Sequence, residues 1–236
     1  MKKIILSAIV LISSNVFAQD CSKNIQFKQG VVITTTNYNE KDKTTGGSKA
    51  TVTAVTSSGT TVTANIKSES FDKDGKSNST GEFTITCSNG KIIMDMKMMM
   101  SGQEEIFKGS TMTIEGDNME IPDNLTVGQT LPDTKVKMTF TKDGANTGTM
   151  DILIKNRKVE GKESITTTAG TFECYKISYE IESAMVMMMG TMQIPGFKNS
   201  SKAVMYYNIE NGSIKTESYS EKGKLIGYSL VTDIKK

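Results

Sequence analysis

Apolar and polar residues alternate along most of the chain after about the first thirty positions. In residues 60–71, Val62, Ala64 and Ile66 fall on one side of an extended chain. A period of two is typical of β-strands that bury one face. The pattern predicts strands at residues 31–38, 50–56, 60–71, 82–87, 91–100, 135–141, 149–155, 159–166, 171–181, 184–192, 202–207, 214–219 and 225–234.

The segments between these strands contain residues that tolerate a positive φ. They include the pairs Asp74-Gly75, Asn89-Gly90, Asp143-Gly144 and Asn211-Gly212. Such pairs are typical of tight hairpin turns. Beyond the N-terminal region, no segment of ten or more residues has a helical stripe. The sequence therefore predicts an all-β fold, an antiparallel meander that forms a single curved sheet, a half-barrel, or a barrel or sandwich.

The N-terminal region has the pattern of a secretory signal peptide. Lys2 and Lys3 precede an apolar run, and Ala18 ends a short segment of the kind that signal peptidase cleaves. The apolar run is too short to cross a bilayer, which needs about 20 residues. We therefore expect a signal peptide at residues 1–18 and a single all-β domain at residues 19–236, exported and not membrane-spanning. Asp20 argues against lipid attachment at Cys21.

Charge and composition exclude some function classes. Without the signal peptide the formal charge falls from +2 to zero, because only Lys2 and Lys3 are removed. A neutral chain with scattered charges has no footprint for nucleic acid. Histidine is absent, which removes the usual general base and the commonest metal ligand. We expect no enzymatic activity, no catalytic or metal site and no cofactor.

Three cysteines remain after export, namely Cys21, Cys87 and Cys174. An oxidising compartment favours one disulfide and leaves one thiol. Strand alternation places Cys87 on a core face and Cys174 on a more mixed face. The pairing stays open from the sequence.

Methionine is the unusual feature, with 16 residues in the chain. Two strands concentrate them, and the alternating positions are the candidate ligand-binding residues. They are Met94, Met96, Met98 and Met100 on the first strand, and Met185, Met187 and Met189 on the second. If these strands were neighbours, they would form a continuous wall of thioether side chains.

Three interpretations of these methionines compete. Flexible methionines fill irregular gaps in a core, and they also line adaptable sites for lipid-like ligands. Soft thioethers also bind Cu(I), but the predicted alternation points most of the first group inward, away from an arriving metal. Packing and an apolar ligand site are therefore the two main alternatives.

The segment from Glu163 to Tyr179 carries the most recognisable motif. Its Ala-Gly-Thr-Phe string at residues 169–172, followed by Cys174, Tyr175 and Lys176, resembles the signature of the DUF3108-like proteins, also labelled the TapB family. Residues 121–133 are similar to the central crossover of that family, and residues 87–96 to its middle strands. The resemblance implies an all-β envelope protein exported by Bacteroidetes, in the periplasm or outside a Gram-negative cell, and it transfers no catalytic residues.

Two hypotheses of function follow. The first is a non-enzymatic envelope protein whose curved sheet binds an apolar or amphipathic small molecule, such as a lipid. The alternative is a structural or interaction module of the cell envelope with a solid, methionine-rich core. They differ in whether the methionines enclose a site or only fill the interior.

Overall fold

The fold is taken from a computed structural model, which describes residues 23–96, 109, 111–190 and 192–236. The expected signal peptide at residues 1–18, together with Cys21, Met98 and Met100, lies outside the described residues. The boundary between the signal peptide and the domain remains a prediction.

Within the described residues the chain forms one antiparallel sheet of thirteen strands, preceded by a short 3-10 helix, η2 (Ile25–Phe27). The strands are β1 (Val32–Asn39), β2 (Thr44–Ser58), β3 (Thr61–Asp72), β4 (Ser77–Ser88), β5 (Lys91–Met94), β6 (Thr111–Gly116), β7 (Met119–Pro122), β8 (Thr134–Lys142), β9 (Ala145–Thr167), β10 (Gly170–Met189), β11 (Met192–Asn208), β12 (Gly212–Ser220) and β13 (Leu225–Lys235). The all-β prediction is confirmed.

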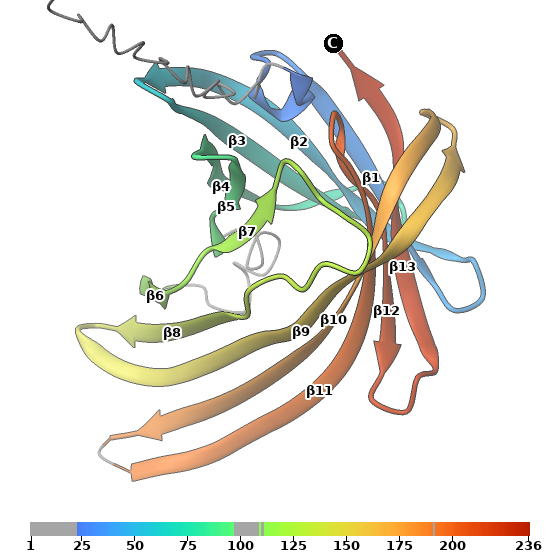
Figure 1. The fold of residues 1–236 in the computed structure, drawn as a ribbon. Helices are drawn as coiled ribbons and strands as arrows, with labels where there is room; N and C mark the ends of the chain where they lie inside the picture. Colours follow the sequence, from blue (N-terminus) through green and yellow to red (C-terminus); the bar gives the residue numbers. More distant parts are fainter. Residues whose placement is uncertain (1–22, 97–108, 110, 191) are drawn as a thin grey trace, which may run out of the picture.

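The sheet is open, with β6 at one end and β7 at the other. Its order is β6-β8-β9-β10-β11-β12-β13-β1-β2-β3-β4-β5-β7. Most neighbouring strands are consecutive in the chain and are joined as hairpins, as the turn residues predicted. The exception at the middle of the sheet is β1, which pairs with β13. The single curved sheet is thus the predicted arrangement that the structure confirms (Figure 1).

The curvature brings the inner faces of the two halves of the sheet around one interior. Ile66 of β3, Ile92 of β5, Ile177 of β10 and Tyr207 of β11 belong to the same buried cluster. A second cluster lies under β8 and β9, and its members are Met96, Val136, Met138, Phe140, Ile152 and Ile154. Strands distant in the sheet therefore share a core, which fixes which face of each strand is the inner one.

A bulge in β9 brings a charged side chain into this interior. Ile152 and Ile154 are buried at even positions, whereas Arg157 and Val159 are buried at odd positions. The change occurs at Asn156, which has a positive φ of 54°. One extra residue in a strand reverses the inside-outside alternation beyond it. The strands predicted at residues 149–155 and 159–166 are therefore parts of one strand, β9, which continues through the bulge. Beyond the bulge, Arg157 points inward.

Arg157 connects β9 to β7, two strands that are not neighbours in the described sheet. Its guanidinium donates from Nη1 to the carbonyl of Pro132 at 2.8 Å and from Nη2 to the carbonyl of Glu120 at 2.9 Å. Glu120 lies in β7, the last strand of the sheet. Burial lowers the pKa of the Arg157 guanidinium, although arginine stays protonated in proteins. A buried cation thus connects the β7 end of the sheet to β9.

Of the two cysteines in the described part of the chain, one is disulfide-bonded and the other is free. Cys87 is disulfide-bonded, whereas Cys174 is a free thiol. Cys174 is fully buried in a small cluster with Tyr206 and Ile214. The structure therefore removes Cys174 from the pairings that the sequence left open.

We expect the Cys174 thiol to be unreactive in the folded protein. Burial, assisted by the charge of Glu173, raises its pKa to about 12, so only about one thiol in 10⁴ is ionised at pH 8, and the thiolate is the reactive form. Ellman's reagent should label one thiol per oxidised chain in denaturant and almost none without it. Cys174→Ala should abolish the signal. Fast labelling of the folded wild-type protein would contradict the burial.

Candidate functional site

The first group of methionines belongs to the interior. β5 ends at Met94, so the strand is shorter than the predicted 91–100. Met94 packs in the main core cluster, and Met96 packs among the residues under β8 and β9. Both point inward, as the alternation predicted, and both are almost fully buried.

The second group of methionines lies at the end of the β10–β11 hairpin. Met187 is 44% exposed, Met189 and Met192 are each 66% exposed, and Phe197 is 49% exposed. These four are among only six large hydrophobic side chains that are exposed in the described part of the chain. Soluble proteins scatter such residues singly, so a concentration marks an interaction surface. We call residues 185–190 and 192–197 the apolar tip.

The register shows how the apolar tip continues from the core. Met138 of β8 pairs with Met150 of β9, and Met150 pairs with Met185 of β10. Met138 is buried and Met150 is half-buried against the same cluster. Farther out, Met187 pairs with Ile194 and Met189 with Met192. Methionine side chains therefore form a path from the buried cluster to the exposed end of the hairpin.

The two predicted methionine strands are not neighbours in the described sheet, so the condition for a shared wall between them is not met. β5 pairs with β4 and β7, whereas β10 pairs with β9 and β11. Of the seven candidate residues, Met94 and Met96 are placed in the core and Met185, Met187 and Met189 on the apolar tip. Met98 and Met100 are outside the described residues. Their role in ligand binding remains a prediction.

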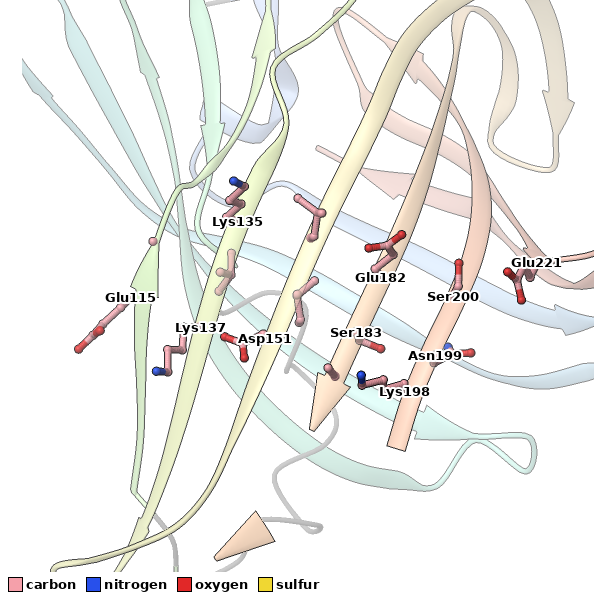
Figure 2. Close-up of a pocket in the computed structure, with 15 residues that line it drawn as sticks. Glu115, Lys135, Lys137, Asp151, Glu182, Ser183, Lys198, Asn199, Ser200 and Glu221 are labelled. Carbon is pink, nitrogen blue, oxygen red and sulfur yellow. The ribbon is translucent and has the colours of Figure 1, made fainter. Parts of the chain in front are cut away.

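A separate trough, with a volume of about 900 Å³, crosses the outer face of the sheet over β6, β8, β9, β10 and β11 (Figure 2). Lys135 and Lys137 line it and alternate with the buried Val136 and Met138. Neighbouring residues of a strand point to opposite faces. The trough therefore lies on the side of the sheet away from the core.

Charges of both signs line this trough in a cross-strand row. Glu115 pairs with Lys137, Lys137 with Asp151, Asp151 with Ala184, and Ala184 with Lys198. Among the described residues, none of the four charged members of this row forms an ion pair. Their charges are thus open to solvent and suited to hydrogen bonds with polar groups.

Next to this row, on the outer face of β9, β10 and β12, several charged side chains form ion pairs. Lys155 contacts Glu182 at 2.5 Å and Lys215 contacts Glu217 at 2.6 Å. Tyr219 also donates to Glu217 at 2.7 Å, and burial raises the pKa of Tyr219 to about 12. These contacts order the middle of the outer face, and one of them holds Glu182 at the edge of the trough.

A smaller hollow, of about 310 Å³, lies between β4 and β5 on one side and the end of β6 on the other. Its lining includes the hydroxyls of Thr84 and Thr86 and the polar side chains of Asp95, Asp117 and Asn118. Neither hollow is lined by any of the candidate methionines.

Sequence reasoning did not identify Phe197, Arg157 or the trough. Lys135, Lys137 and Asp151 do alternate with apolar residues, which places them on an outer face. The sequence does not give the order of the strands in the sheet, and that order is what brings these charges side by side.

The described residues contain no helix with the length and hydropathy of a transmembrane span.

Solved structures resemble this fold closely over most of the chain. A putative exported protein with a YmcC-like fold from Bacteroides fragilis has a TM-score of 0.68 and 21% identity, covering 89% of this chain and 97% of its own. A putative lipoprotein from Parabacteroides distasonis has a TM-score of 0.66 and 22% identity, covering 89% of this chain and 96% of its own. At such identities the likeness establishes the fold.

The family comparison agrees with the motif at residues 169–176. No curated protein matches the chain. The model of the DUF3108-like family matches residues 28–231, a span that includes every strand from β1 to β12. The chain belongs to the DUF3108-like family.

Proposed function

We propose that this protein is a non-enzymatic binding protein of the cell envelope, which holds an apolar or amphipathic molecule against the apolar tip. The observation that carries the proposal is the concentration of exposed Met187, Met189, Met192 and Phe197 on one hairpin. Methionine side chains are flexible and polarisable, so they adapt to apolar groups of varied shape. The absence of histidine from the chain supports a binding role over a catalytic one.

The location outside the cytoplasm is part of the same proposal. The pattern at residues 1–18 supports export, and the two similar structures are described as an exported protein and a lipoprotein, each putative. An envelope compartment also supplies amphipathic molecules in abundance. We place the protein in the periplasm or on the outer surface of the cell.

The test uses a fluorescent anthroyloxy-stearic acid, titrated below its critical micelle concentration. We expect saturable binding by the wild-type protein and weaker binding by Met187→Ser with Met189→Ser. Each methionine that loses its apolar contact removes about 1 kcal/mol, so the pair should weaken binding about 30-fold.

The matched control is Val127→Ser with Ile226→Ser, since these residues are 57% and 54% exposed and lie elsewhere. The control should bind like the wild type. Absence of saturable binding, or equal losses in the two double variants, would contradict the proposal.

A structural or interaction module is the second candidate, and the burial of Met94 and Met96 favours it. In that role the apolar tip would contact a protein. A co-purifying partner that protects the tip from methionine oxidation, together with failure to bind the fatty acid, would favour this alternative.

A further inference from the structure

The apolar tip lacks charge on both of its faces. No charged residue occurs from Met185 to Phe197. Met187 and Met189 lie on one face of β10, while Val186 and Met188 lie on the other and are half-buried. An exposed strand of a water-facing sheet alternates apolar with polar residues. A hairpin end that carries no charge on either face, with Gln193 opposite Met188 as a polar side chain, is suited to an environment less polar than water.

The tip lies at an extremity of the molecule, and β9 pairs with its β10 strand as far as Met187. The end of the β10–β11 hairpin forms one extremity of the fold in Figure 1. β11 pairs with β12 only from Ser201 onward, so its outer segment has a free edge in the described structure. From Met185 to Met189 the tip extends about 13 Å at a rise of roughly 3.3 Å per residue.

Along the β10–β11 hairpin itself the nearest charges that remain unpaired are positive, whereas on β9 the unpaired Asp151 lies opposite Ala184, beside the base of the tip. Between Glu182 and Glu210 the only charged residues are Lys198 and Lys202. Glu182 is neutralised by its contact with Lys155, whereas neither of the two lysines forms an ion pair in the described part of the structure. An uncharged end with lysines behind it is complementary to an apolar layer beneath a negatively charged surface.

We infer that the apolar tip docks on the surface of an anionic lipid bilayer. Met187, Met189, Met192 and Phe197 enter the boundary between head groups and acyl chains, and Lys198 lies at the level of the phosphates. Insertion is shallow, because the free edge of β11 presents backbone groups that need water or head groups as partners. The inference rests on the proposed function, since the same residues serve both, and it names a bilayer as the amphipathic ligand.

The experiment measures sedimentation of the full mature protein with vesicles. Vesicles of phosphatidylethanolamine and phosphatidylglycerol should carry the wild type down, and pure phosphatidylcholine vesicles should carry several-fold less. Met187→Ser with Met189→Ser and Phe197→Ser should weaken binding to the anionic vesicles at least tenfold. Lys198→Glu should weaken it about fivefold and reduce its dependence on salt. The Val127→Ser and Ile226→Ser control should sediment like the wild type.

Fluorescence supplies an independent readout, because the chain contains no tryptophan. Phe197→Trp should shift its emission to the blue when anionic vesicles are added, while Ile226→Trp should not shift. Equal sedimentation of the tip variant and the control, or an unshifted Phe197→Trp spectrum, would overturn the inference. If the monomeric fatty acid binds but vesicles do not, membrane docking fails alone. If neither binds, the proposed function fails with it.

Discussion

Arg157→Met should destabilise the protein by about 2–5 kcal/mol, measured by urea unfolding. The guanidinium holds two carbonyls, those of Pro132 and Glu120. Each buried acceptor left without a donor costs roughly 1–3 kcal/mol. Methionine fills much of the same space, so water has little room to replace the lost donors.

The opposing effect is the recovered cost of burying a charge. Replacing a whole buried ionic network by apolar residues is often neutral. Here the carbonyls belong to the backbone and remain after the substitution, so we expect the unsatisfied acceptors to dominate. A loss below about 1 kcal/mol would show that other donors reach these carbonyls. Lys158→Met, an exposed change at the next position, should cost less than about 1 kcal/mol.

Met96→Ala and Met187→Ala should differ sharply, although the sequence gives the two residues the same candidate role. Met96 is one of the six buried residues of one cluster, and truncating a buried methionine to alanine costs about 2–5 kcal/mol. Met187 is 44% exposed at the end of a hairpin, so its truncation should change the stability by less than about 0.5 kcal/mol. Urea unfolding of both variants measures the difference.

Binding assays on the same two variants distinguish a core methionine from a surface methionine. Met187→Ala should weaken binding of the fatty acid probe, whereas Met96→Ala should leave it unchanged wherever the variant is folded. Similar stabilities for the two variants would contradict the division of the methionines into core and tip.

Local patterns predicted most of the strands because burial of one face imposes a period of two. The alternation also placed Met94 and Met96 inward, and Asp143-Gly144 correctly marks the turn between β8 and β9. These features depend on residues that are close in sequence. They are therefore accessible without knowledge of the fold.

Long-range pairing was not accessible in the same way. β6 pairs with β8, while the next strand, β7, returns to β5. Nothing in the residues between Gly116 and Met119 specifies that division. This division of β6 and β7 between the two ends of the sheet separates the predicted methionine strands. It also brings together the strands that form the charged trough.

Single-residue irregularities also escaped prediction. Asn156 reverses the alternation of β9, and only after that reversal does Arg157 face the interior. Read as an ordinary strand, the sequence gives no reason to bury a cation. The exposure of Met187 and Met189 had a different cause, because the strand pattern does not say where along β10 the core ends.

The pairing of β1 with β13 has a consequence for how the protein forms. Val32 lies opposite Lys235, and the contacts run from there to Asn39 and Gly227. Strands near opposite ends of the chain thus meet at the centre of the sheet, and a contact between such distant residues is slow to form. During folding the N-terminal strands lack their central partner until the last strand is available to pair. Over that interval the edge of β1 is open to aggregation or to a chaperone, and completion of the sheet is a late event that depends on the whole chain.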